Sequence, residues 1–508
     1  MILEDLDRHA RERPGERAVV EISADGSVRE LTWAALKNNA DRVAAALLSL
    51  GVLEGEPVAF QLPNRLEFVT IALGVLRAGA VCEPLMPIFR ERELGFMLGE
   101  SRARVLFVPK QHRGRDHAAM AHVLRASLPG LEHVVVLPEA YDELLDKASI
   151  GDFPALTGAH IAQLLFTSGT SGEPKGALQR HDVLDRAADH HIAHFGLGPD
   201  DVIYVPSPLA HQTGFLYGMW IALRLGVPQI LQEVWDAEVG LDAMRRFGVT
   251  FVQAATPFLA DLTRVAEERA ETPEALTAFV ATGAAIPRDL ARRSRDVLGA
   301  EVGGAWGTTE SCLGCAFAPG DPPERAWGTD GRALANVRLR IVDDEGRELT
   351  AGEEGNFEVH TDCLFEGYLN RPELTAEVIT PDGWYRTGDL ARIDEAGYVR
   401  ITGRVKDVIN RGGEKVPVAE IEQLLHAHPA VREVAIVAMP DERLGERACA
   451  FVVGELDFDT MLEYLDAHRV SKTYWPERLE VVDTLPRTPS GKIQKFILRA
   501  QARELVTT

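Results

Sequence analysis

A loop rich in Thr, Ser and Gly follows a stretch of apolar residues in the first half of the chain. The apolar stretch, Ile161 to Phe166, is typical of a buried strand, and seven of the ten residues after it are Thr, Ser or Gly. Glycine lets backbone N–H groups approach an anion closely, and hydroxyl groups add donors, so such a loop suits phosphate oxygens. Lys175 adds a positive charge that a phosphate can use. On composition alone, a flexible surface connector is the alternative.

The order of residues in this loop separates two classes of phosphate-binding protein. The loop lacks the Gly-x-x-x-x-Gly-Lys-Ser/Thr spacing of P-loop NTPases. The segment Thr167 to Gly176 instead resembles the Thr-Ser-Gly-Thr-x-Gly-x-Pro-Lys-Gly loop of the adenylate-forming superfamily, which comprises acyl-CoA synthetases, adenylation domains of peptide synthetases and luciferases. The resemblance implies that the β- and γ-phosphates of ATP are bound by Thr167, Ser168, Gly169, Thr170, Ser171, Gly172 and Lys175.

The chain is too long for a single hydrophobic core, since it has 508 residues. Short apolar segments at 58–60, 105–108 and 134–137 alternate with helical patterns such as the one from Leu36 to Leu50. This alternation predicts a layered α/β architecture with a largely parallel sheet. Between Gly331 and Val359 the segments become short and alternating, which indicates an antiparallel sheet or a small barrel.

A segment rich in Gly, Asn and Arg near Gly403 marks the expected domain boundary. We expect a large amino-terminal domain, residues 1–402, that holds the ATP and acyl sites. A small, mobile α+β domain, residues 403–508, follows it. Its last part, Leu485 to Thr508, carries five basic residues and one acidic residue, which suits an element that meets a polyanion.

Charge, hydropathy and cysteine content exclude several classes of protein. The formal net charge of −23 argues against nucleic acid and anionic membranes as partners. The apolar run from Phe68 to Leu76 is too short to span a membrane, and the acidic start, Met1 to Asp7, is unlike a signal peptide. Five scattered cysteines fit a reducing compartment, and the pair Cys312 and Cys315 lacks the further ligands of a metal site. We therefore expect a cytoplasmic protein.

Further segments match the same superfamily in its order, so the resemblance spans nearly the whole chain. Val280 to Pro287 leaves a strand through small residues, which let a flat ring lie against the backbone. Ala305 to Glu310 matches the family's Tyr or Trp followed by Gly-x-Thr-Glu. The resemblance implies adenine and acyl contacts for Gly283, Ala284, Ala285 and Gly307, adenine stacking for Trp306, α-phosphate contacts for Thr308 and Thr309, and Mg²⁺ binding for Glu310.

The third and fourth segments place further nucleotide contacts near the expected domain boundary. In Trp384 to Leu390, Asp389 corresponds to a carboxylate that accepts hydrogen bonds from both ribose hydroxyls. In Gly403 to Asp407, Arg404 resembles the family's ribose-contacting Arg, and Lys406 occupies its hinge position.

Two segments of the expected small domain resemble family segments that act in different steps, thioester formation and adenylate formation. Asn410 to Lys415 resembles the loop that faces the site during thioester formation, so Arg411, Gly412 and Gly413 would face CoA and let its narrow pantetheine arm pass. Leu485 to Ile493 resembles the segment whose Lys, here Lys492, reaches the site for adenylate formation. An ammonium there would stabilise charge that gathers around the α-phosphate.

The segment Pro206 to Gly214 and its surroundings indicate the class of substrate. No Asp or Glu lies between Val202 and Gln232, whereas amino-acid-activating relatives keep an acidic residue near here for the substrate ammonium. We therefore expect an apolar carboxylic acid, with His211 near its carboxylate and Phe215 in the acyl pocket. Residues 207–218 and 474–482 resemble bacterial cyclohexanecarboxylate–CoA ligases and related short- to medium-chain acyl-CoA synthetases.

The resemblance implies an ATP-dependent acid–thiol ligase with Mg²⁺ as cofactor and CoA as acceptor. The acid is alicyclic, aromatic or a short to medium chain. Asn410-Arg411 with Glu414-Lys415 also resembles aryl-acid enzymes that load carrier proteins, so a carrier-protein thiol or an amine stays open as the acceptor. A nucleotide-binding protein without catalytic activity is the alternative from another class. Whether the protein forms a homodimer is left open.

Overall fold

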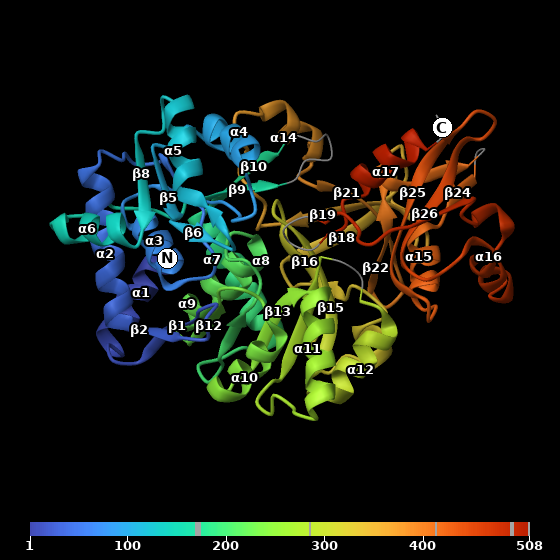
Figure 1. Cartoon of the computed structure of the whole chain (residues 1–508), viewed down its shortest axis with the longest axis horizontal. Helices are drawn as coiled ribbons and strands as arrows, with labels where there is room; N and C mark the ends of the chain where they lie inside the picture. The colour runs from blue at the N-terminus through green and yellow to red at the C-terminus, as the bar shows by residue number, and fades with distance from the viewer. Residues whose placement is uncertain (168–173, 284–285, 412–413, 488–491, 506–508) are drawn as a thin grey trace.

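We describe a computed structural model of the chain, shown in Figure 1. The structure describes residues 1–167, 174–283, 286–411, 414–487 and 492–505. Within those ranges, every helix is too short or too polar to cross a lipid bilayer.

A nine-stranded sheet forms the centre of the molecule, and its inner strands run parallel. The sheet order is β17 (Arg332–Ala333), β16 (Cys312–Ala316), β15 (Glu301–Thr308), β14 (Ala278–Thr282), β13 (Phe251–Ala255), β11 (Ile203–Val205), β12 (Gln229–Gln232), β1 (Arg17–Ile22) and β2 (Val28–Thr32). Three helices with a shared apolar core accompany it: α10 (Ala237–Phe247), α11 (Thr256–Arg269) and α12 (Arg288–Leu298) (Figure 1).

A seven-stranded sheet lies beside the first, and its strands β4, β3, β5 and β8 are parallel. Its order is β20 (Gly367–Tyr368), β10 (Lys175–Arg180), β9 (Ile161–Thr167), β4 (Val81–Pro84), β3 (Pro57–Phe60), β5 (Val105–Pro109) and β8 (His133–Leu137). The apolar segments at 58–60, 105–108 and 134–137 are therefore strands, as predicted. A single large core of buried side chains is shared by the two sheets.

Helices cover the seven-stranded sheet and fill the space between the two sheets. They are α1 (Ile2–Glu12), α2 (Trp33–Ser49), α3 (Leu66–Arg77), α4 (Glu91–Ser101), α5 (His117–Ser127), α6 (Glu139–Lys147), α7 (His181–Phe195), α8 (Gln212–Gly214), the π-helix η1 (Phe215–Trp220) and α9 (Ile221–Leu225). The helix α2 confirms the pattern at 36–50, because its residues Leu36, Ala40, Val43 and Leu47 all face the core.

A four-stranded antiparallel sheet follows the nine-stranded sheet in the chain. It has the order β18 (Val337–Val342), β19 (Gly355–Thr361), β21 (Tyr385–Ile393) and β22 (Val399–Arg404). Antiparallel pairing was one of the two alternatives for this region. The short helix α13 (Pro323–Ala326) precedes this sheet in sequence, and the short helix α14 (Pro372–Val378) lies between β19 and β21. The expected boundary at Gly403 falls within β22.

The carboxyl-terminal part forms a small α+β unit at one end of the molecule (Figure 1). Its strands are β23 (Ile409–Arg411), β24 (Glu414–Val416), β25 (Val431–Asp441), β26 (Gly445–Gly454) and β27 (Arg478–Val481), and its helices are α15 (Val418–His426), α16 (Phe458–Ala467) and α17 (Lys495–Glu504). Each of two separate apolar clusters packs a part of this unit. The predicted fold class, layered α/β with a small α+β part, is confirmed.

Candidate active site

Several of the predicted ATP-binding residues lie at, or next to, the carboxyl ends of two neighbouring parallel strands. In open α/β sheets, ligands bind at this edge. Strand β14 ends at Thr282 and leads to Gly283, while the neighbouring β15 ends at Thr308 and leads to Thr309 and Glu310. Gly283 has a positive φ of 84°, a conformation that favours glycine. The sheet therefore brings two of the predicted motifs side by side.

Trp306, Asp389 and Arg404 form one connected group. The indole Nε1 of Trp306 donates to Oδ2 of Asp389 over 2.9 Å. The guanidinium Nε of Arg404 lies 3.0 Å from Oδ1 of the same carboxylate. Asp389 on β21 and Arg404 on β22 are direct cross-strand partners, so sheet register sets this contact. Three residues with predicted adenine and ribose contacts thus meet, although they come from distant motifs.

Glu310 is held by Tyr368, a residue that the motifs did not indicate. The Tyr368 hydroxyl donates to Oε1 of Glu310 over 2.8 Å, and both residues are at most 8% exposed. Burial, together with the nearby carboxylate of Glu310, raises the pKa of Tyr368, so its hydroxyl stays a donor. The ammonium of Lys175 lies 5.0 Å from the centre of the Tyr368 ring, within cation–π range. Tyr368 therefore joins Lys175, at the end of the predicted phosphate-binding loop, to Glu310.

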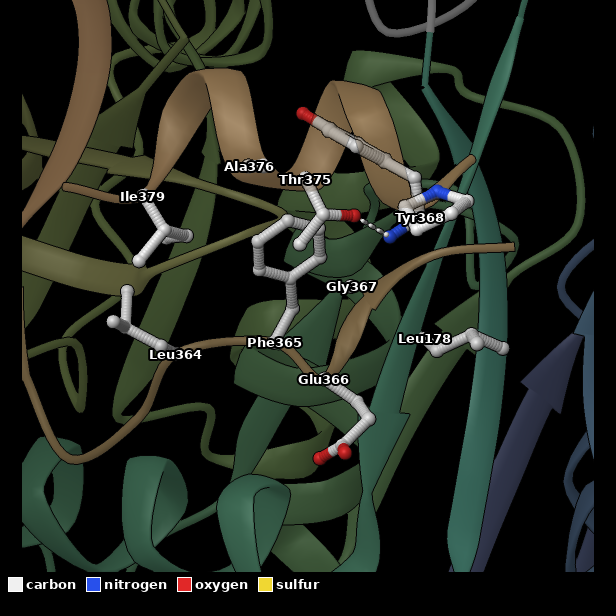
Figure 2. A pocket seen from close by; sticks show the side chains of 10 residues that line it. Leu178, Leu364, Phe365, Glu366, Gly367, Tyr368, Thr375, Ala376 and Ile379 are labelled. Carbon is white, nitrogen blue, oxygen red and sulfur yellow. Dashed lines mark hydrogen bonds between the residues drawn. The ribbon is translucent and has the colours of Figure 1, made fainter. Parts of the chain in front are cut away.

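The backbone around Glu310 and Tyr368 is fixed by further hydrogen bonds. Phe365 N donates to the Glu310 carbonyl over 2.7 Å, and the amide of Gln179 donates to the Thr309 carbonyl. Tyr368 N donates to Thr375 Oγ1 over 2.9 Å, as Figure 2 shows. These bonds connect three chain segments, so Glu310 sits in a rigid setting.

Lys492 reaches this site from the carboxyl-terminal part of the chain. Its Cε lies 3.3 Å from the point that a β-carbon on Gly283 would occupy. Surrounding protein lowers the pKa of Lys492, and the charge of Arg404 lowers it further, against the opposite effects of Asp389 and Glu310. The basic group thus lies among the residues with predicted phosphate and ribose contacts.

His211 lies close to Lys492 and is neutral at physiological pH. Burial, with a contribution from the charge of Lys492, lowers the pKa of His211 to about 4. Its Nδ1 accepts a long hydrogen bond, 3.3 Å, from the backbone N of Thr213 at the start of α8. A neutral imidazole beside an ammonium can contact a carboxylate without adding a second charge.

The contacts of the remaining predicted residues say less about their roles. Phe215 is fully buried and packs against Phe68 and Trp220. Gly307 has no room for a side chain, because a β-carbon there would lie 2.5 Å from the Cys312 carbonyl oxygen. Thr167 donates to the Lys175 carbonyl over 3.4 Å at the base of the loop.

The predicted CoA-facing and hinge residues lie in the carboxyl-terminal part. Arg411 pairs with Glu477 over 2.6 Å, so its guanidinium has a partner within the small unit. The Lys406 carbonyl accepts from Arg499 over 2.6 Å. Their roles stay predictions. Residues 168–172, 284–285 and 412–413 carry further predictions but lie outside the described residues.

A pocket of about 580 Å³ lies next to this site, between β10, β20 and α14 (Figure 2). Its walls include Leu178, Phe365, Tyr368, Thr375 and Ile379. Of the described residues that line it, Tyr368 touches Glu310, and none has a predicted ATP or acyl contact.

Comparison with known proteins agrees with these motifs. Residues 6–369 match the AMP-binding enzyme family, and residues 420–492 match the AMP-binding enzyme C-terminal domain. The chain is 37% identical to the medium-chain fatty-acid–CoA ligase of Escherichia coli K12 and 35% identical to the salicyl-AMP ligase / salicyl-S-ArCP synthetase of Mycobacterium tuberculosis H37Rv. Both matches cover 98% of this chain and 90% of the relative.

Its fold matches a solved structure over the whole length. The ATP-bound crystal structure of MatB from Rhodopseudomonas palustris superimposes with a TM-score of 0.88 at 28% identity, covering 99% of this chain and 100% of that one. The predicted resemblance is thereby confirmed. The chain belongs to the AMP-binding, adenylate-forming enzyme family.

Proposed function

We propose that the protein is an ATP-dependent acid–thiol ligase that makes acyl-CoA through an acyl-AMP intermediate. In the first step a carboxylate oxygen attacks the α-phosphorus of ATP, and the bond to the bridging oxygen of pyrophosphate breaks. In the second step the thiol sulfur of CoA attacks the acyl carbon, the bond to AMP breaks, and the thiol proton passes to solvent. The single observation that carries this proposal is Lys492, which lies beside Gly283 and His211.

The first step needs charge stabilisation and orientation more than covalent work by the protein. Lys492 would place its ammonium near the oxygens of the α-phosphate, where negative charge gathers in the transition state. Neutral His211 would orient the attacking carboxylate. Asp389, which is held by Trp306 and Arg404, would bind the ribose hydroxyls.

The residues present fit a bound Mg²⁺. Glu310 offers a hard carboxylate oxygen, of the kind that Mg²⁺ prefers, and Tyr368 fixes the other oxygen of the same group. The hydroxyl of Thr308 lies two residues away and is fixed by Ser311 over 3.0 Å. Bound there with ATP, Mg²⁺ would neutralise part of the phosphate charge.

The second step would use a different orientation of the small domain, residues 403–508. We propose that this domain turns about Lys406, withdraws Lys492 and presents the loop that contains Gly412 and Gly413 to the thiol. One cleft would then serve two transition states in turn.

The class of carboxylic acid and the acceptor of the acyl group are the more specific parts of the proposal. The absence of Asp and Glu from the segment 202–232 favours an apolar acid body, alicyclic, aromatic or of short to medium chain length. Among the relatives described above, the one of higher identity is named a CoA ligase, which supports CoA. The salicyl-AMP ligase relative is named for transfer to a carrier protein, so a carrier thiol, or an amine, is the second candidate acceptor.

Pyrophosphate exchange tests the proposed function. Labelled pyrophosphate should enter ATP only when a suitable carboxylic acid is present. AMP release with CoA, with a holo-carrier protein and with amines, measured separately, should be fastest with CoA. A protein that binds ATP but gives no exchange with any acid of a broad panel would be a catalytically silent nucleotide-binding protein.

A further inference from the structure

Several buried polar atoms, on Gln212 next to His211 in the chain and on three further residues, have no hydrogen-bond partner among the described residues. They are both amide atoms of Gln212, the hydroxyl of Tyr217, Nδ1 of His191 and Nε2 of Gln253. All four residues are at most 6% exposed. Burying a polar atom without a partner is costly, so such atoms are rare and call for an explanation.

The four residues form one cluster, although they come from four elements. His191 on α7 contacts Gln253 on β13, with 2.6 Å between Nε2 and Oε1, and its ring stacks on Tyr217 of η1 at 5.1 Å. At the start of β16, the hydroxyl of Tyr217 lies near the backbone of Leu313, and the amide of Gln212 lies near Cys312. Neither side chain completes a hydrogen bond of normal geometry to a described residue there. We call this set the polar cluster.

The chemistry of the polar cluster is neutral and mixed. Burial lowers the pKa of His191 to about 3, so its ring is uncharged. If Nε2 of His191 donates to Oε1 of Gln253, the ring leaves Nδ1 as an acceptor and the amide leaves Nε2 as a donor. Tyr217 adds a hydroxyl, and Gln212 adds one donor group and one acceptor.

The polar cluster lies on the side of the site where the acid is expected. Gln212 follows His211, which is close enough to Lys492 for its pKa to respond to that charge. Cys312 lies two residues beyond Glu310. Tyr217 sits in the π-helix η1, an uncommon element that is frequent at functional sites. The rings of Phe195 and Phe251 lie 4.7 and 5.6 Å from His191 and give the cluster apolar surroundings.

We propose that the polar cluster, His191, Gln212, Tyr217 and Gln253, binds a hydroxyl group on the body of the acid. The preferred substrate is then a hydroxylated aromatic or alicyclic acid rather than a plain hydrocarbon acid. A hydroxyl both donates and accepts, so it matches a set that offers both. A charged substituent would lose its hydration without gaining a counter-charge from the cluster. This inference rests on the proposed function.

Matched pairs of acids test the inference by pyrophosphate exchange. Benzoate is compared with its three monohydroxy derivatives, and cyclohexanecarboxylate with its hydroxy derivatives. For at least one position of the hydroxyl, kcat/KM should exceed that of the parent acid by about tenfold or more, since sites built around a hydroxyl discriminate strongly against its absence. Parent acids that equal or outperform every hydroxy acid would overturn the inference and assign the polar atoms to bound water.

A conservative variant adds a second test. Tyr217→Phe removes one hydroxyl and should reduce the ratio of kcat/KM between the hydroxy acid and its parent severalfold or more. Tyr141→Phe is the matched control, because Tyr141 on α6 is equally buried, at 6% exposure, and should keep the wild-type ratio. Equal changes for both acids in Tyr217→Phe would contradict the inference. The wild-type ratios decide the question even if that variant does not fold.

Failure of the proposed function would look different. In that case no acid, hydroxylated or plain, would support exchange. Working exchange with a preference for plain acids would leave the ligase intact and refute only the role of the polar cluster.

Discussion

The hydroxyl of Tyr368 donates a hydrogen bond to Glu310, and Tyr368→Phe removes that bond while it keeps the ring near the ammonium of Lys175. Both partners are almost fully buried, so water screens the interaction little. A hydrogen bond to a charged group contributes about 1.5–3 kcal/mol. At about 1.4 kcal/mol for each factor of ten, its loss should weaken the binding of metal·ATP by roughly 10- to 100-fold. The same range is typical of outer-shell partners of metal ligands.

The backbone should hold the phenylalanine where the tyrosine was. Tyr368 N is bound to Thr375 Oγ1, and the strand β20 pairs with β10, so the variant keeps its place. Any change can then be assigned to the missing hydroxyl rather than to a displaced segment.

Two measurements check this prediction. Electron paramagnetic resonance of Mn²⁺ in the presence of ATP reports metal binding directly, and pyrophosphate exchange across a Mg²⁺ series reports the half-saturating metal concentration. In Tyr368→Phe we expect both constants to rise by the stated factor, with most of the maximal rate recovered at high Mg²⁺. Tyr141→Phe, buried far from the site, should behave like wild type. An unchanged metal requirement in Tyr368→Phe would refute the reasoning.

Three further predictions concern catalysis and stability. Lys492→Ala should abolish adenylate formation yet largely spare thioester formation from supplied acyl-AMP; equal loss in both half-reaction assays would contradict the two-orientation proposal. Burial raises the pKa of Glu83 to about 8 from 4.5. Above pH 4.5 the unfolded chain has released this proton, and the carboxyl group must bind it again on folding. The resulting loss of folding free energy grows as pH rises from 4.5 towards 8. Glu83→Gln should therefore stabilise the protein at pH 7 by about 3 kcal/mol, and by much less at pH 5, in urea unfolding; a difference independent of pH would contradict this. Burial lowers the pKa of His117 and of His181 to about 4. The unfolded chain therefore takes up a proton at each ring before the folded protein does, and stability falls as pH drops from 6.5 towards 4. The expected loss is about 2–3 kcal/mol for each ring at pH 4.5. His181→Gln should flatten that decline in the same measurement, and an unaltered slope would argue against it.

The parallel strands were predictable because a strand that is buried on both faces has apolar residues at consecutive positions. Strand β5, Val105–Pro109, is buried at every position and is therefore a continuous apolar run. Helix α2 has a periodic pattern instead, because only the residues on its core-facing side need to be apolar. Both patterns are local, so they can be read without knowledge of the tertiary contacts.

The contacts within the site could not be predicted in this way. Tyr368 lies in a strand of two residues, too short for any periodicity, and its partner Glu310 is 58 positions away. The bond between Trp306 and Asp389 spans 83 positions. In the polar cluster, His191 and Gln253 resemble ordinary isolated polar residues until the fold buries them together. The motifs identified residues with shared chemistry, whereas tertiary structure determined which of them touch.

The position of Arg404 separates the two proposed orientations of the small domain. Arg404 is the last residue of β22 and pairs directly with Asp389 on β21, so sheet hydrogen bonds hold it to the large part of the molecule. The chain leaves that sheet in η2, Val405–Asp407, which contains the proposed hinge Lys406. A rotation about Lys406 would therefore move only the part of the small domain that follows this residue, so it would carry Lys492 away and leave the Trp306–Asp389–Arg404 group in place. The ribose of the nucleotide would be held in the same way through both steps, and the charge at the α-phosphate is what the moving domain would add and remove.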